Sequence, residues 1–81
     1  LTEERRKELV RHVKKVGEEF RVSMRNHRRD ANERIKKQLK DKQIAEDQSR
    51  VALDRIQKMT DEHIDKLDKA LKVKEDELMA V

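Results

Sequence analysis

The sequence contains no cysteine and no proline, and it has one glycine and one aromatic residue among 81 residues. Without cysteine, the chain has no disulfide, no thiolate nucleophile and no cysteine metal site. Without proline, no residue forces a helix to break, and Gly17 lowers helix propensity by only about 1 kcal/mol relative to alanine. Phe20 alone does not provide a row of aromatic rings on which a flat ligand could stack.

Long apolar runs are missing as well. No run approaches the roughly 20 residues that a membrane-spanning helix needs, and no signal peptide is recognisable. These absences predict a protein without a membrane partner that works in the cytosol or in an organelle matrix. The length allows one small domain, residues 1–81, whose core is marginal because a short chain buries little of its surface.

Charge is abundant and unevenly distributed. Charged residues make up 49% of the chain and apolar residues 33%, which is typical of long helices or a coiled coil. Residues 1–43 carry 15 Lys and Arg against 8 Asp and Glu, a net charge of +7. Residues 44–81 carry 7 against 10, a net charge of −3. The basic first half therefore predicts a surface that faces an anionic partner.

Apolar residues recur at helical spacing in both halves. We expect a first helix over about 2–42, with Thr2 as its N-cap, and a second over about 46–79, which Glu46 and Asp47 open. Residues 43–46 would form the turn, so the predicted fold is all-α, a long antiparallel helical hairpin. The expected stripe of the first helix consists of Leu9, Val13, Val16, Phe20, Met24, His27, Ala31 and Ile35.

The apolar arc of the second helix is wider than one antiparallel partner covers, about 140° at 100° per residue. An arc of this width favours a third helix, as in a three-helix bundle. The chain contains two helices only, so either two copies associate or the sequence is part of a larger domain.

Four arginines lie close together on the first helix. Arg21, Arg25, Arg28 and Arg29 fall on one arc along a flank of the apolar stripe, and Lys7, Arg11, Lys14 and Lys36 extend the row. Guanidinium forks bind phosphate oxygens in pairs, so such a row is typical of a surface for a nucleic-acid backbone. The alternative interpretation is a solvated face whose charges pair with acids three or four residues away.

The sequence offers no constellation for catalysis or for a metal. We expect no enzyme activity, no catalytic residue, no metal site and no cofactor, because the histidines, serines and carboxylates do not combine at the required spacings. His27 and His63 fall on the apolar arcs and are expected to be packed in the core.

Four segments carry a resemblance to a known family. "LTEERRKELV" at 1–10, "RVSMRNHRRDANERIKK" at 21–37, "KDKQIAED" at 40–47 and "KVKEDELMAV" at 72–81 resemble ribosome recycling factor. The resemblance implies an L-shaped protein with a three-helix bundle and a small β domain inserted after the first helix. This chain resembles the last two helices of the bundle, and the first helix and the β domain are expected to be absent from it.

The resemblance also implies a function and a site. The family recycles ribosomes after translation termination together with elongation factor G, and its helical domain binds 23S rRNA of the large ribosomal subunit. The arginines that match its rRNA contacts are Arg25, Arg28 and Arg29, with Arg28 foremost, and we add Arg6 and Arg21. The family usually has Ser where Ala45 stands, so the turn could be softened toward a continuous helix by the loss of a cap worth about 1 kcal/mol.

The alternative function is a self-associating helical or coiled-coil module without RNA binding. A hairpin alone would leave open an apolar strip bounded by Val13, Phe20, Ile56, His63 and Leu67. A strip of this kind tends to find a partner, so a homo-oligomer is expected at high concentration.

Overall fold

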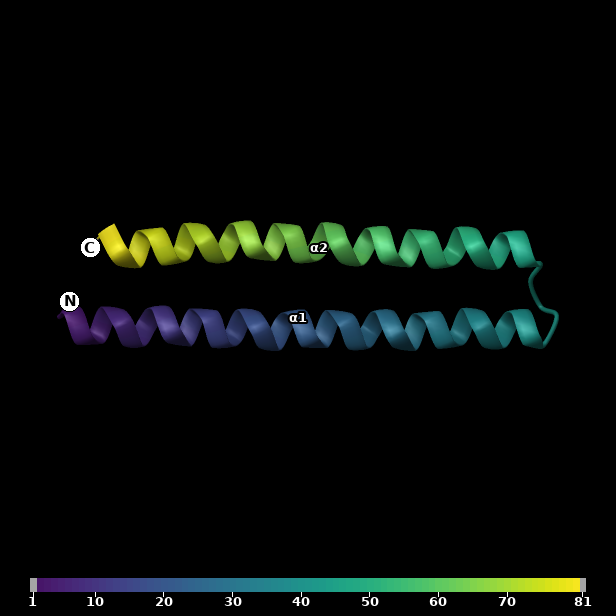
Figure 1. Ribbon diagram of the computed structural model, residues 1–81, viewed down its shortest axis with the longest axis horizontal. Helices are drawn as coiled ribbons and strands as arrows, with labels where there is room; N and C mark the ends of the chain where they lie inside the picture. Colours follow the sequence, from purple (N-terminus) through teal and green to yellow (C-terminus); the bar gives the residue numbers. More distant parts are fainter. Residues whose placement is uncertain (1, 81) are drawn as a thin grey trace.

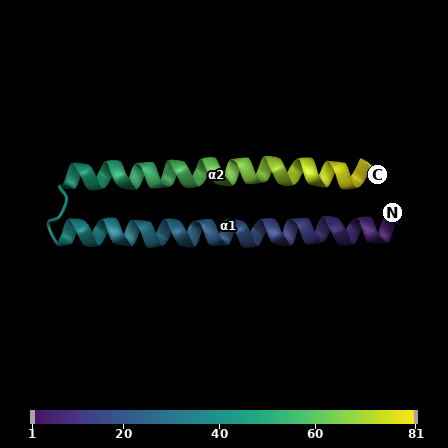
Figure 2. The same cartoon turned by 180° about the vertical axis from the view of Figure 1, so that it is seen from behind.

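The computed structural model describes residues 2–80 and contains two helices, α1 (Glu3–Lys40) and α2 (Glu46–Ala80). They run antiparallel side by side, with both ends of the chain at one end of the molecule (Figures 1 and 2). The extents are 60 × 15 × 9 Å, and residues 2–80 include no strand. The prediction of an all-α helical hairpin is confirmed; the expected domain bounds, residues 1 and 81, lie outside the described range.

Helix α1 begins as its first residues predict. The side chain of Thr2 accepts a hydrogen bond from the backbone N–H of Arg5 at 3.1 Å, so Thr2 is the N-cap. Glu3 and Glu4 occupy the first turn, where their charges favour the positive end of the helix dipole. The helix thus starts on a capped turn without contribution from α2.

Helix α1 ends at Lys40, two residues before the expected bound. Lys42 adopts a left-handed backbone with φ 60°. Its N–H donates to the carbonyl of Leu39 at 3.1 Å, and the N–H of Gln43 donates to the carbonyl of Gln38 at 2.9 Å. This pair of bonds is the Schellman motif that closes helix C-termini, usually with glycine at the left-handed position. The chain therefore turns at a residue that carries a Cβ.

Helix α2 begins at Glu46, with Ala45 in the N-cap position. Alanine offers no side-chain acceptor, but its backbone N–H donates to Oε1 of Gln48 at 2.8 Å. This bond is one half of a capping box, in which a side chain three residues on satisfies the N-cap amide. The turn therefore separates two helices, and the expected alternative of a continuous helix is wrong.

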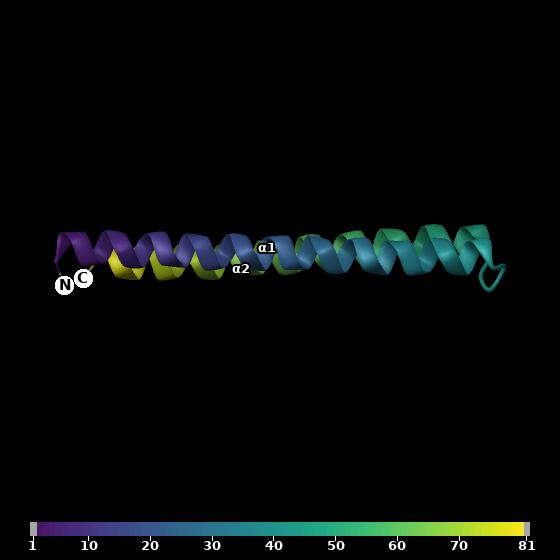
Figure 3. The ribbon, with the colours of Figure 1, turned by 90° about the horizontal axis from the view of Figure 1, so that it is seen from below.

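The two helices meet along a seam that is only half-buried. No hydrophobic residue among residues 2–80 is buried; Gly17 and Ser49 are the buried positions. Gly17 is buried because Leu71 of α2 packs directly on its backbone. The half-buried apolar residues of the two helices are Leu9, Val10, Val13, Val16, Met24, Ala31, Ile35 and Leu39 on α1, and Ala52, Leu53, Ile56, Ile64, Leu67, Leu71 and Leu78 on α2. Figure 3 shows the helices crossing at a shallow angle along this seam.

Only one side of the apolar stripe predicted for α1 packs against α2. Met24, Ala31 and Ile35 face α2, whereas Phe20 is 54% exposed. His27 and His63 are also exposed, so the expectation that they are core residues is wrong for this hairpin. The wide arcs cannot be covered by one partner helix, so their outer halves remain open to solvent. No helix in the described range is long and apolar enough to cross a membrane.

Candidate nucleic-acid interface

The hairpin has two different long faces, which meet at the seam. On one side of the seam lies an open apolar groove, which we call the groove face. On the other side, the basic residues of α1 run beside acidic residues of α2, and we call this the charged face. The basic row runs along this flank of α1, with Arg28 at the seam, and consists of Lys7, Arg11, Lys14, Arg21, Arg25, Arg28, Arg29 and Lys36. At 1.5 Å per residue the row extends over about 44 Å of α1.

Arg21 joins the two helices across the charged face. Its Nε donates to Oδ1 of Asp68 on α2 at 2.9 Å, and its Nη1 donates to Oε2 of Glu18 at 3.1 Å. The hydrogen bond to Asp68, followed by that to Glu18, holds the pKa of Arg21 above its ordinary value. The side chain of Arg21 is 25% exposed. Its guanidinium is therefore engaged within the hairpin.

Glu18 also approaches the next arginine of the row. Its Oε1 lies 3.8 Å from Nη1 of Arg25, while its Oε2 binds Arg21. Arg25 is exposed, and among residues 2–80 this long contact is its one ion pair. Because an exposed pair at such a distance contributes little free energy, Arg25 can exchange Glu18 for a phosphate oxygen.

Arg28 and Arg29 stand apart from these pairs. Arg29 is exposed, and Arg28 is half-buried beside the seam. Within residues 2–80, neither guanidinium has an ion-pair or hydrogen-bond partner among the interactions of the hairpin. Two arginines that are adjacent in the sequence therefore have no counter-charge within the described hairpin.

The remaining candidates have different surroundings. Arg6, expected as an rRNA contact, is half-buried in the first turns of α1. Lys36 is exposed and lies 3.9 Å from Glu33, three residues before it on the same helix. Thus Arg25 and Arg29 lie on the charged face and Arg28 lies at the seam, where it also lines the groove. Arg6 lies about five to six helical turns away from them.

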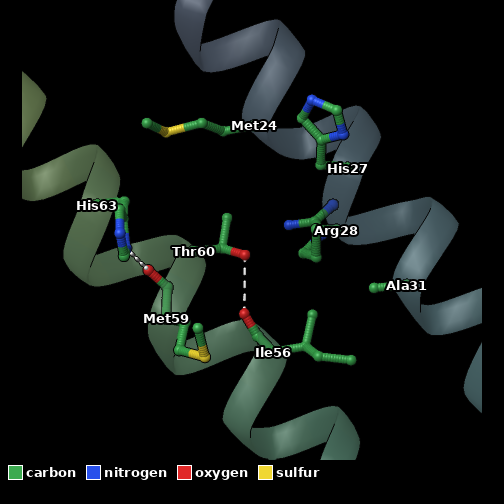
Figure 4. Close-up of a pocket in the computed structure, with 8 residues that line it drawn as sticks. All are labelled: Met24, His27, Arg28, Ala31, Ile56, Met59, Thr60 and His63. Carbon is green, nitrogen blue, oxygen red and sulfur yellow. Dashed lines mark hydrogen bonds between the residues drawn. The ribbon is translucent and has the colours of Figure 1, made fainter.

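The groove face is apolar in its centre. An open pocket in this face is lined by Met24, His27, Arg28, Ala31, Ile56, Met59, Thr60 and His63 (Figure 4). The polar groups of Thr60 and His63 are occupied within α2: the Thr60 hydroxyl donates to the carbonyl of Ile56 at 2.8 Å, and Nδ1 of His63 donates to that of Met59 at 2.7 Å. The described residues include no group of three or more His, Cys, Asp or Glu that could hold a metal.

Sequence reasoning found the basic row and the pairing of Glu18 with Arg21 or Arg25, but it missed the contact of Arg21 with Asp68. Asp68 and Glu18 engage Arg21, so the four arginines that share an arc differ in their availability to a ligand. The antiparallel arrangement brings Arg21 and Asp68 together although they are 47 residues apart. The acidic character of the second half was the one signal for such a contact, and it does not specify which acid is involved.

Comparison with known proteins identifies the family. The sequence model of the family described as ribosome recycling factor matches residues 1–79. The ribosome-recycling factors of Nitrosomonas europaea, Neisseria gonorrhoeae and Burkholderia cenocepacia are 60%, 57% and 54% identical over 81 residues. Each match covers 100% of this chain and 44% of the relative, so the chain spans less than half the length of these proteins. On these matches and on its two-helix fold, the chain belongs to the ribosome recycling factor family.

Proposed function

We propose that this hairpin contributes the RNA-binding surface for ribosome recycling after translation termination, by binding 23S rRNA of the large ribosomal subunit in concert with elongation factor G. The observation that carries the proposal is the pair Arg28 and Arg29, which lie in the basic row without a counter-charge in the hairpin. Phosphate oxygens would supply that charge through short, charge-assisted hydrogen bonds. The family membership supports a role in recycling.

The arginines of the row would have distinct roles. Arg29 and Arg25 are exposed and would bind phosphates directly. Arg28 would bind at the edge of the seam, where its half-buried stem already limits its conformations. Arg21 would fix the spacing of the two helices through Asp68, and its contribution to binding would come from its positive charge. Arg6 would extend the surface toward the start of α1.

The proposed role is binding without chemical catalysis. Phosphate binding by a row of arginines uses fixed positive charge and needs no group of shifted pKa near neutrality. The proposed place of action is the bacterial cytoplasm or an organelle matrix, where the ribosomes that the protein would help to recycle are found.

Splitting of the ribosome should require more than these 81 residues, since the chain spans 44% of its relatives. The hairpin would bind the large subunit weakly, and the coupling to elongation factor G would depend on the rest of the protein. In a splitting assay with elongation factor G and GTP, we expect no activity from the hairpin alone. Splitting at the rate of a full-length relative would refute this division of roles.

The test of RNA binding is a salt titration of hairpin binding to purified large subunits. Each lost phosphate contact lowers the slope of log K against log salt by about 0.7–0.9. Arg29→Ala should lower the slope by one such step and weaken binding roughly tenfold or more, which corresponds to about 1.5–3 kcal/mol for a charge-assisted bond. Arg28→Ala should do the same, with an added loss of side-chain packing.

The matched control is Arg55→Ala, which removes the same side chain from an exposed position on α2. Lys66→Ala, also exposed on α2, is a second control. Both should leave the slope and the affinity nearly unchanged, and circular dichroism should report equal helicity for all variants. If Arg29→Ala and Arg55→Ala bind alike, the basic row is a solvated face and the proposal is wrong.

A further inference from the structure

One acidic residue lies within the basic row itself. At about 100° per residue, Glu18 falls on the arc of α1 that carries Arg21, Arg25 and Arg29. The other acids from residue 7 to residue 36, a stretch that the structure describes in full, lie roughly 40° or more outside this arc: Glu8, Glu19, Asp30 and Glu33. A phosphate backbone that follows the row therefore meets a carboxylate of its own charge sign, which repels it.

Glu18 is shared between two arginines of the row. Its Oε2 accepts a hydrogen bond from Nη1 of Arg21 at 3.1 Å, whereas its Oε1 lies 3.8 Å from Nη1 of Arg25. The second distance is longer than a hydrogen bond, and the side chain of Glu18 is 60% exposed. Glu18 is therefore bound to Arg21 and only approaches Arg25.

Arg21 is itself held by the other helix. Its Nε and its Nη2 both donate to Oδ1 of Asp68 on α2, and its Nη1 donates to Glu18. The edge formed by Nε and Nη2 is one that can bind two oxygens of a phosphate, and Asp68 occupies it. The side chain of Arg21 is 25% exposed, compared with 45% for Arg25. Arg21 is thus a fixed cation beside Glu18, and Arg25 is the arginine that can move.

We propose that Glu18 limits how tightly the row binds RNA, because phosphate has to displace it from Arg25, and that Arg21 keeps Glu18 neutralised during this exchange. The inference rests on the proposed RNA-binding function and concerns the strength of that binding. The guanidinium of Arg25 turns from Oε1 of Glu18 to a phosphate oxygen, while Oε2 keeps its hydrogen bond to Arg21. Asp68 acts on the RNA surface from α2 without contacting RNA, since it holds Arg21 in place.

The size of the effect follows from the exposure of the contact that is lost. Exposed ion pairs change an equilibrium constant by a factor of about 1.5–5. Glu18→Gln removes the charge and keeps the length of the side chain and its helix propensity. The variant should therefore bind large ribosomal subunits about two- to fivefold more tightly than the parent chain.

The test measures binding of the 81-residue chain to purified large ribosomal subunits at one low salt concentration. Glu19→Gln is the matched control, because it removes the same charge from the next residue, which is exposed and lies outside the row. We expect Glu18→Gln to bind more tightly than Glu19→Gln by the stated factor. Circular dichroism on the same samples should show equal helicity for both variants.

The role of Arg25 is tested by combining substitutions. In an Arg25→Ala chain, Glu18→Gln should gain no more affinity than Glu19→Gln does, because the exchange needs Arg25. In an Arg29→Ala chain, the gain from Glu18→Gln should remain in full. A carboxylate that only stabilised the helix would show no such dependence on Arg25.

The role of Arg21 is tested in the same way. Arg21→Gln removes the cation that holds Oε2, so Glu18 would pair with Arg25 alone and compete more strongly with phosphate. The gain in affinity from Glu18→Gln should therefore be larger in the Arg21→Gln chain than in the parent. An equal or smaller gain would refute the neutralising role of Arg21.

The outcomes separate this inference from the function on which it rests. If Arg29→Ala weakens binding but Glu18→Gln binds no more tightly than Glu19→Gln, RNA binding stands and the role of Glu18 is wrong. If the gain from Glu18→Gln persists in full without Arg25, the exchange at Arg25 is wrong. If Arg29→Ala binds like Arg55→Ala, the proposed function fails and this inference fails with it.

Discussion

Gly17 permits a close contact between the two helices, and Gly17→Leu should separate them. A Cβ built on Gly17 would overlap Cδ1 of Leu71 and lie 3.4 Å from its Cδ2. Ordinary carbon–carbon contacts lie near 3.5–4.0 Å. Any side chain at position 17 therefore has to displace Leu71 or push α2 away.

The change in the free energy of unfolding on substitution of Gly17 follows from two opposing effects. Replacing glycine in a helix interior gains about 0.8–1 kcal/mol of helix propensity. For Gly17→Ala, Leu71 has to shift its terminal methyls, which costs about 0.5–1.5 kcal/mol, so the free energy of unfolding should change little. For Gly17→Leu, overpacking costs about 1–3 kcal/mol, so after the propensity gain the hairpin should lose about 0–2 kcal/mol overall.

The assay is urea unfolding followed by circular dichroism at one fixed protein concentration. Ser23→Leu, at an exposed position of α1, is the control for propensity alone and should be neutral or stabilising. Leu71→Ala should cost less in the Gly17→Leu chain than in the parent, with a coupling of about 0.5–3 kcal/mol. If Gly17→Leu and Ser23→Leu stabilise the chain equally, Gly17 has no role in the seam.

Three further predictions concern the turn and the ion pair between the helices. Lys42→Gly should raise the free energy of unfolding by about 1 kcal/mol in urea titrations, because Lys42 has φ 60° and glycine adopts that backbone without strain. Ala45→Ser should stabilise the chain by a similar amount, about 1 kcal/mol, by restoring a side-chain acceptor at the start of α2; an unchanged melting curve would contradict this. Arg21→Ala and Asp68→Asn should lower the melting temperature by similar amounts and less than additively when combined. The pKa of Arg21 is raised in the folded chain, so the ion pair stabilises the fold at any pH below the ordinary pKa of arginine and loses this effect only above it. The difference in melting temperature between each variant and the parent chain should therefore be constant between about pH 6 and pH 9.

The helices and their ends were predictable because their signals are local. Thr2, Glu46 and Asp47 act through hydrogen bonds or charge within one turn of their own helix, and all three mark helix starts in the structure. The early end of α1 was not predictable, because the left-handed position is held by Lys42, which carries none of the preference that glycine has there.

The rotation of each helix about its own axis could not be derived from periodicity. A wide apolar arc is compatible with several contact lines, and the sequence does not say which part faces the other helix. The seam runs through Gly17 and Arg21, while His27 from the predicted stripe lines the open groove and Phe20 is exposed. This choice depends on contacts such as Gly17 with Leu71, which join residues distant in sequence.

The sequence predicts that the basic residues form a row, but it does not predict which arginines of the row are engaged within the protein. Helical spacing alone places the four arginines on one flank of α1. Which of them is engaged within the protein depends on Asp68, which the fold brings to Arg21 from the other helix. The prediction that Arg25, Arg28 and Arg29 bind rRNA stays a prediction.

Short-range photocrosslinking to the large ribosomal subunit tests that prediction most directly. The chain has no cysteine, so one valine at a time can be replaced by cysteine and labelled with a benzophenone. Val22 lies beside Arg25 and Arg29 on α1, and Val73 lies on α2; they are 46% and 56% exposed. The proposed interface predicts crosslinks to 23S rRNA from position 22, their loss when Arg29→Ala is added, and few or none from position 73. Equal crosslinking from both positions, or crosslinking from position 22 that survives Arg29→Ala unchanged, would contradict it.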